Sequence, residues 1–159
     1  MKLTGKIAKE FIMNIKAEAF CNFLSENKIK DYQVKELADD EQNTIVFCTN
    51  IEAENKLLPT WVLLNDSLFI TIRVMILQNA FTPDNEMKSL YFVNSQNRDF
   101  RPFKMYFDGD GSLVMELCWA ANEQTQEDFS ALGNEIYRGL DMVIMFLKQN
   151  YKKWMNDIL

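Results

Sequence analysis

The spacing of hydrophobic and polar residues changes several times along the chain, and each change marks a predicted element. Near the start, apolar residues recur at steps of three or four from Ala8 to Leu24. This spacing is typical of an amphipathic helix, and Thr4 is a residue type that caps helix N-termini. We therefore expect an N-terminal helix that begins at Thr4 and ends near Asn27.

Four strand-like runs follow this helix. Residues 32–37 and 44–49 alternate or are rich in β-branched and aromatic side chains, with a polar turn between them. Residues 50–59 are polar enough to predict a loop. Residues 60–64 and 68–77 predict two further strands joined by a turn-forming Asn-Asp-Ser triplet. The four runs thus predict two hairpins.

A short helix is predicted after the second hairpin. Asp84 or Asn85 can cap it, and one of its sides carries Met87, Leu90, Tyr91 and Val93 or Asn94.

The clearest local signal is the tetrapeptide Asp108-Gly109-Asp110-Gly111, which joins the β-rich runs 104–107 and 112–117. Asp-Gly pairs between such runs predict a tight hairpin, because glycine adopts positive φ without strain. Both glycines are expected to be needed for the backbone geometry, and both aspartates are expected to serve the turn.

The last element is a long helix. Residues 125–128 resemble a capping box, and apolar residues keep helical spacing from Phe129 to Trp154. The order α-ββ-ββ-α-ββ-α predicts an α+β fold, in which helices flank an antiparallel sheet of two or three hairpins. We find no linker or repeat, so residues 1–159 are expected to form one domain.

Six consecutive apolar residues, 142–147, surround the whole circumference of the final helix. Only one side of a helix can face the core of the domain, so the apolar residues on its other sides need a second partner. We expect them to form a homodimer contact with a second subunit. A client segment, or the sheet and first helix of the same chain, are the alternative covers. The candidate partner surface comprises Met142, Ile144, Met145 and Phe146.

Charge and cysteine content limit the classes of function. The chain has 17 Lys and Arg against 23 Asp and Glu, a net charge of −6, and no long basic run, so nucleic acid is not an expected partner. Signal-peptide and membrane-spanning patterns are absent. Cys21, Cys48 and Cys118 form no metal-binding or disulfide pattern, which predicts free, buried thiols in the cytoplasm.

Catalytic patterns are equally sparse. The chain has no histidine, which removes the Ser-His and Cys-His arrangements and the commonest zinc sites. Asp108 and Asp110 have the spacing of a calcium loop, but the glycine and glutamate that complete such a loop are missing. Cys48 and Cys118 are enzyme candidates, as are the carboxylates near strand ends, but no partner orders any of them. These carboxylates are Asp66, Asp108, Asp110 and Glu116. We predict no catalytic residue, no metal and no cofactor.

The region from 87 to 151 resembles the YbjN-like domain. The resemblance lies in Phe92-Val93-Asn94-Ser95-Gln96-Asn97, the Asp-Gly hairpin with its flanking strands, and the long apolar helix. This domain is related to the type III secretion chaperones, whose members are small, acidic and cytoplasmic. The resemblance implies roles for Asn94 and Asn97, whose amides we expect to close the helix C-terminus, while Gln96 stands where many members have an aromatic residue.

Three functions remain open at this stage. The leading hypothesis is a non-enzymatic, homodimeric protein-binding module, chaperone-like or regulatory, that holds a protein segment on its sheet and helix surface. The second is a dimeric regulatory protein without a client. The third is an enzyme that uses carboxylates, Cys48 or Cys118.

Overall fold

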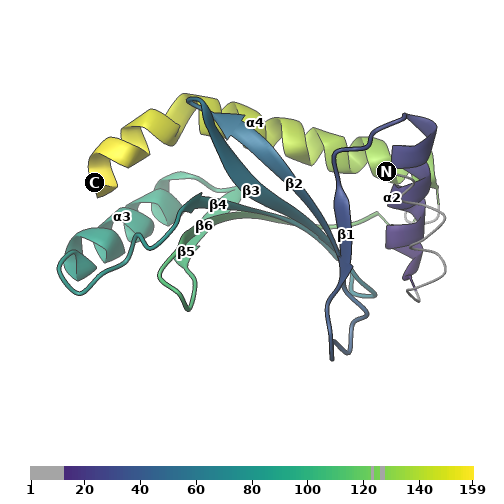
Figure 1. Ribbon diagram of the computed structural model, residues 1–159, viewed down its shortest axis with the longest axis horizontal. Helices are drawn as coiled ribbons and strands as arrows, with labels where there is room; N and C mark the ends of the chain where they lie inside the picture. Colours follow the sequence, from purple (N-terminus) through teal and green to yellow (C-terminus); the bar gives the residue numbers. More distant parts are fainter. Residues whose placement is uncertain (1–12, 123, 126–127) are drawn as a thin grey trace.

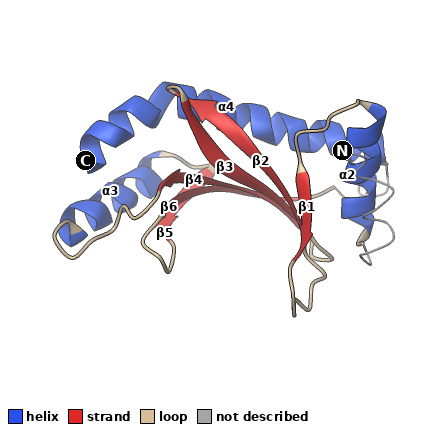
Figure 2. Cartoon of the chain, in the orientation of Figure 1, coloured by secondary structure: helices blue, strands red, loops and turns tan. Residues whose placement is uncertain are grey.

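The protein is an α+β domain built on one antiparallel sheet, as the sequence predicted (Figures 1 and 2). The computed structural model describes residues 13–122, 124–125 and 128–159. In this part of the chain the elements are α2 (Ile15–Glu26), β1 (Gln33–Glu36), β2 (Ile45–Ala53), β3 (Lys56–Leu64), β4 (Phe69–Leu77), α3 (Glu86–Asp99), β5 (Phe103–Phe107), β6 (Leu113–Ala120) and α4 (Phe129–Ile158).

The six strands are ordered β1-β2-β3-β4-β6-β5, and every neighbouring pair is antiparallel. The first four strands form a meander. After β4 the chain makes α3 and returns as the edge strand β5, and β6 then lies between β4 and β5. This order brings α3 to the β5 edge of the sheet.

One face of the sheet is covered by helices. In Figure 1, α4 runs across the top of the strands and α2 lies beside its first half. Phe20 of α2 packs against Phe47 of β2, with ring centroids 4.9 Å apart, and Trp154 of α4 is 1% exposed. Burial of such large side chains is the main stabilising term of the domain.

The segment 50–59 is wrongly predicted as a loop. It forms the ends of β2 and β3 and their connection, in which Glu54 and Asn55 have φ of 48° and 62°. Two residues with positive φ make the turn that best matches the twist of a hairpin. The polar Asn50 and Glu52 suggested a loop because they point away from the core, whereas Ile51 between them is buried.

Two helix starts also differ from the predictions. The first helix is not continuous through Asn14, because the side chain of Asn14 accepts a hydrogen bond from the Ala17 amide and caps α2 there. The predicted start at Thr4 lies outside the described residues. At α4 the cap is Asp128, which accepts from two amides of the first turn, while the Thr125 hydroxyl donates to Glu135 instead.

The end of α2 at Glu26 and the length of α4 agree with the predictions. Along the described ranges, we find no helix that combines the length and the hydrophobicity needed to cross a bilayer.

Candidate functional site

The β5–β6 hairpin is confirmed, and its acidic side chains serve the turn. The Gly111 amide donates to the Asp108 carbonyl at 2.8 Å, and the Asp108 amide donates to the Ser112 carbonyl at 2.9 Å. The Asp108 and Asp110 carboxylates accept from the amides of Gly109 and Ser112. These bonds stabilise the conformation of the loop.

Only one of the two glycines is required by the backbone, contrary to the prediction. Gly111 has φ of 81°, and a Cβ there would approach the Phe81 carbonyl oxygen to 2.9 Å. Gly109 does not have positive φ, and a Cβ there would meet nothing within 4 Å. Gly111 therefore fixes the hairpin against the segment before α3.

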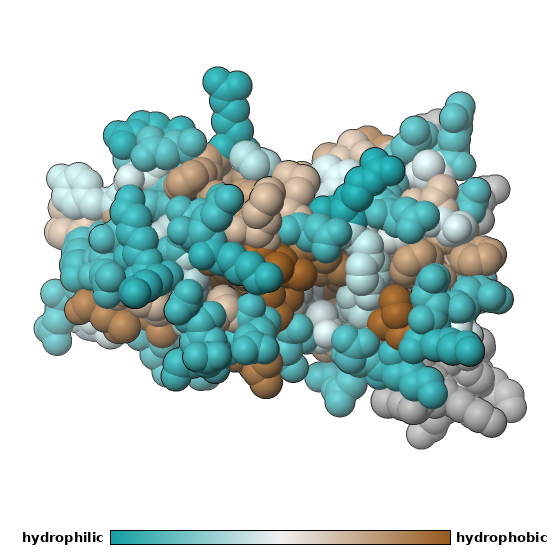
Figure 3. Space-filling view, turned by 90° about the horizontal axis from the view of Figure 1, so that it is seen from above, coloured by the Kyte–Doolittle hydropathy of each residue, from teal (hydrophilic) through white to brown (hydrophobic). Residues whose placement is uncertain are grey.

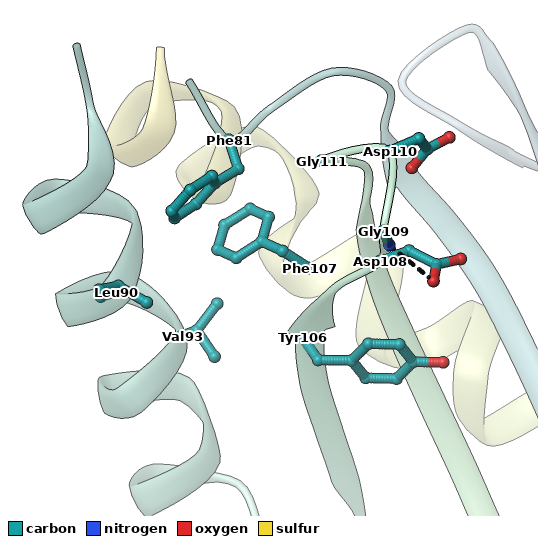
Figure 4. Close-up of a pocket in the computed structure, with 9 residues that line it drawn as sticks. All are labelled: Phe81, Leu90, Val93, Tyr106, Phe107, Asp108, Gly109, Asp110 and Gly111. Atoms are coloured by element: carbon teal, nitrogen blue, oxygen red, sulfur yellow. Dashed lines mark hydrogen bonds between the residues drawn. The ribbon is translucent and has the colours of Figure 1, made fainter. Parts of the chain in front are cut away.

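A groove of about 640 Å³ lies between α3 and this hairpin (Figure 4). The rings of Phe81 and Phe107, with centroids 5.1 Å apart, form its base, and Leu90 and Val93 of α3 form its opposite wall. In Figure 4 the carboxylates of the turn point away from these apolar side chains. The inside of the groove is therefore suited to an apolar side chain.

The outer face of α3 is also apolar. Met87, Leu90 and Tyr91 are 64%, 49% and 69% exposed, and together with Asn94 they line a shallow hollow of about 290 Å³. These residues were expected to be the packing stripe of the helix, but the opposite side packs inward, where Phe92 is buried. Leu90 borders both the hollow and the groove, so the two form one surface.

The two asparagines of the sequence motif have different surroundings. The Asn97 side chain makes two hydrogen bonds to the backbone of Met105 in β5, donating to its carbonyl at 3.0 Å and accepting from its amide at 2.7 Å. It therefore joins α3 to the sheet edge. The prediction that the Asn97 amide closes the helix C-terminus is wrong. Asn94 is exposed on the outer face of α3.

Gln96 is buried, and its carbonyl oxygen accepts a hydrogen bond from the Trp154 indole at 2.8 Å. A phenylalanine at position 96 would offer no oxygen or nitrogen acceptor to this indole donor. Gln96 thus ties α3 to the last turns of α4.

The second face of the sheet carries no helix over its centre within the described chain, as Figure 1 shows beneath the strands. Leu57, Pro59, Trp61 and Leu63 follow one another along β3 on this face, and Leu57 is 69% exposed. We call this face the open face. The interpretation of the polar 50–59 segment as a loop hid this row, because Leu57 and Pro59 belong to that segment.

A charged cluster borders the row on the open face, and sequence reasoning did not find it. Glu116 of β6 is 6% exposed and accepts from Arg73 Nε at 2.6 Å, the Tyr106 hydroxyl at 3.0 Å and Lys104 Nζ at 3.0 Å. Desolvation alone would raise the pKa of the Glu116 carboxyl, but these hydrogen bonds and the Arg73 charge outweigh it and hold the pKa below its usual value. Of these residues the sequence analysis named only Glu116, because the strand order that joins it to Arg73 and Lys104 could not be known from the sequence.

The three thiols differ in burial. Cys21 is buried, and desolvation raises its pKa to about 12. Cys48 is partly buried on the open face, and desolvation raises its pKa as well. Cys118 is exposed on the same face, which corrects the prediction that it is a core residue.

The predicted partner surface on α4 is divided by the structure. Met142 and Met145 are exposed, at 41% and 57%, as expected, and Ile144 is partly buried. Phe146 is a core residue and was wrongly included, because it stacks on Phe103 with centroids 4.2 Å apart. Seen from the α4 side, apolar patches are interrupted by polar residues (Figure 3).

Within residues 13–122, 124–125 and 128–159, no three His, Cys, Asp or Glu side chains gather as metal ligands would. Asp66 accepts a hydrogen bond from Asn43 in the loop next to β3. No family model matches the sequence, and neither does any curated protein.

Proposed function

We propose that the protein is a non-enzymatic, homodimeric protein-binding module, chaperone-like or regulatory, that works in the cytoplasm and holds an extended protein segment on its open face. The observation that carries this proposal is the apolar row Leu57, Pro59, Trp61 and Leu63 on a sheet face without a covering helix. The resemblance to YbjN-like domains and secretion chaperones agrees with it, as does the α+β order of elements.

The row is unusual for a strand with one solvated face. Such strands alternate apolar and polar residues, and β2 follows that rule near Asn50 and Glu52. β3 instead carries apolar residues on both faces, and Phe69 of the neighbouring strand is 51% exposed on the open side. Contiguous exposed apolar surface of this kind marks interaction sites.

The surroundings of the row indicate the kind of segment that fits. An extended peptide presents a side chain to the sheet at every second residue, so apolar residues at alternate positions would match the row. Arg73, which pairs with Trp61 in the strand register, keeps 43% of its side chain exposed beside the row, and Lys104, on the edge strand β5, is 63% exposed. Glu116 fixes the positions of both cationic groups. These donors would bind backbone carbonyls or an acidic side chain of the client.

Substitution of Leu57 tests the proposal. Extract from the source cells is passed over the parent protein and over Leu57→Lys, a substitution that the exposed position tolerates. A client bound by the parent should be lost from Leu57→Lys and kept by Leu68→Lys, which alters a turn residue of similar exposure, 49%. Purified client should then protect β3 amides from hydrogen exchange.

The proposal fails if the parent retains no protein, or if retention is equal for the two variants. A dimeric regulatory protein without a client is the second candidate, because the outer face of α3 offers an apolar surface even if the open face binds nothing. In that case the parent is a dimer and the extract experiment gives no bound protein.

The third hypothesis, an enzyme, gains no support from the groups that it requires. Glu116 is held ionised by three donors, which makes it a poor proton donor or acceptor near neutral pH. The raised pKa of Cys48 disfavours its thiolate.

A further inference from the structure

The strand β5 forms one edge of the sheet and pairs only with β6. In an antiparallel pair, every second residue bonds to the partner strand, and the residues between turn their N–H and C=O groups the other way. The Asp108 amide donates to the Ser112 carbonyl, so Tyr106, two residues earlier, also bonds toward β6. Met105 is at the alternate position, and its N–H and C=O therefore point outward from the sheet edge.

The side chain of Asn97 occupies both outward groups of Met105. Its Nδ2 donates to the Met105 carbonyl at 3.0 Å, and its Oδ1 accepts from the Met105 amide at 2.7 Å. A carboxamide carries the same kinds of donor and acceptor as a peptide unit. Two bonds to one residue are also the pattern by which an antiparallel strand pairs with its neighbour. The Asn97 side chain thus lies where the backbone of a further strand would lie.

We propose that Asn97 blocks strand addition at the β5 edge and so prevents β5 from pairing with β5 of a second copy of the chain. An unblocked edge strand is a template for pairing with another chain, because its outward N–H and C=O groups need partners. The proposal goes beyond the proposed function, since it concerns the edge of the sheet and not the open face.

The composition of the two edge strands explains why β5 needs such a block. The five residues of β5 are three aromatic residues, a methionine and Lys104, and segments of this kind favour strand pairing. The opposite edge, β1, has four residues, of which Gln33, Lys35 and Glu36 are exposed. A short, charged edge strand pairs poorly with other chains. The edge that lacks this protection is the edge that Asn97 covers.

Other residues hold α3 beside β5, as Figure 1 shows, so the bonds of Asn97 can be removed separately. Phe92 and Gln96 of α3 are buried, and Gln96 accepts a hydrogen bond from the Trp154 indole at 2.8 Å. These contacts do not involve the Asn97 side chain. A substitution at position 97 should therefore free the backbone of Met105 while α3 stays attached to α4.

The experiment compares Asn97→Leu with Asn134→Leu in the full chain. Leucine has nearly the size of asparagine but neither donor nor acceptor, and Asn134 is an exposed asparagine of α4, so the control adds the same apolar side chain to another helix. Hydrogen exchange of the Met105 amide is measured by mass spectrometry with fragmentation to single residues, at 1 and 100 µM protein. Sedimentation velocity at both concentrations measures assembly, and circular dichroism checks folding.

We expect the Met105 amide to exchange slowly at both concentrations in the parent and in Asn134→Leu. In Asn97→Leu at 1 µM it should exchange about tenfold faster or more, because its acceptor is lost. At 100 µM its protection should return as β5 edges pair, and assemblies larger than those of the parent should appear.

Three results would overturn the proposal. The first is a Met105 amide that stays protected in Asn97→Leu at 1 µM, since the Asn97 bonds would then not control the edge. The second is an amide that remains unprotected at 100 µM without larger assemblies, because the edge would then not pair even when it is free. The third is equal assembly of the two leucine variants, which would assign the association to the added leucine. If Asn97→Leu does not fold, Asn97→Ala is subjected to the same measurements and the same criteria.

Discussion

The two faces of the sheet obey different constraints. On the covered face, Phe47, Val62 and Ile72 are completely buried under α2 and α4. On the open face, apolar side chains lie beside a charged cluster and remain partly in solvent. The residues of the first face form a packed core, whereas the apolar row of the second is only partly buried, which is why we propose a binding function for it.

Adjacent residues of β2 test this contrast most strongly. Phe47 points to the covered face and is 0% exposed, while Cys48 points to the open face. Phe47→Ala should destabilise the domain by about 3–5 kcal/mol, because it removes a ring from a packed core and leaves a cavity. Cys48→Ala should cost less than about 1 kcal/mol. Urea unfolding followed by circular dichroism measures both.

Equal losses at the two positions would contradict the distinction between the faces. A large loss for Cys48→Ala alone would mean that the open face is covered in solution, and a dependence of that loss on protein concentration would identify a second copy as the cover.

Two glycines, one packed between helices and one in an exposed turn, should show the same contrast with a smaller loss of stability. Gly133 lies where α4 meets α2, and a Cβ at this position would overlap the ring of Phe23. Gly133→Ala should destabilise by about 1–3 kcal/mol through overpacking. Gly109→Ala, in the exposed turn, should change stability by less than about 0.5 kcal/mol because nothing lies near the added methyl group. A stable Gly133→Ala would show that α2 shifts easily over the sheet.

Local signals in the sequence were sufficient for most elements of the fold. The Asp-Gly hairpin and the amphipathic α4 are encoded by residues close together in the chain, so their prediction succeeded. The β2–β3 connection was missed because the end of β2 has few hydrophobic residues. There the polar Asn50 and Glu52 flank the single apolar Ile51, and such a segment resembles a loop. Its Glu54-Asn55 turn has no glycine to mark it.

Long-range contacts explain what could not be predicted of the site. Glu116 meets Arg73 only because β6 inserts beside β4, and no local pattern fixes that order. Lys16 resembles an exposed helix residue, yet it is 2% exposed and donates to the carbonyls of Ser67 and Phe69. The apolar residues of α3 were recognised, but which side of a short helix faces the core depends on its neighbours.

The charged cluster provides a pH-dependent test of the open face. The pKa of Glu116 is lowered from the ordinary value of 4.5, so its contribution to stability is present above that value and is lost as pH falls through the lower, folded-state pKa. Glu116→Gln should cost about 1 kcal/mol at pH 7, a modest loss since its cationic partners remain partly solvated. The variant should lose less stability than the parent between pH 5 and pH 3 in urea titrations. If the free energy of unfolding falls equally with pH in the parent and in the variant, the cluster adds nothing to the stability of the fold.

The smallest perturbation is chemical labelling of the thiols, which reports on both faces without a substitution. Cys118 is exposed on the open face, Cys48 is partly buried there, and Cys21 is buried on α2 with a pKa raised to about 12. Because thiol reactivity follows access and thiolate fraction, Ellman reagent should label Cys118 first, Cys48 at least roughly tenfold more slowly, and Cys21 only after denaturation. Peptide mapping assigns each step. If a bound client or a second copy covers the open face, the labelling of Cys118 should slow and the labelling of Cys21 should not change. Rapid labelling of Cys21 in the native protein would contradict the packing of α2 against the sheet.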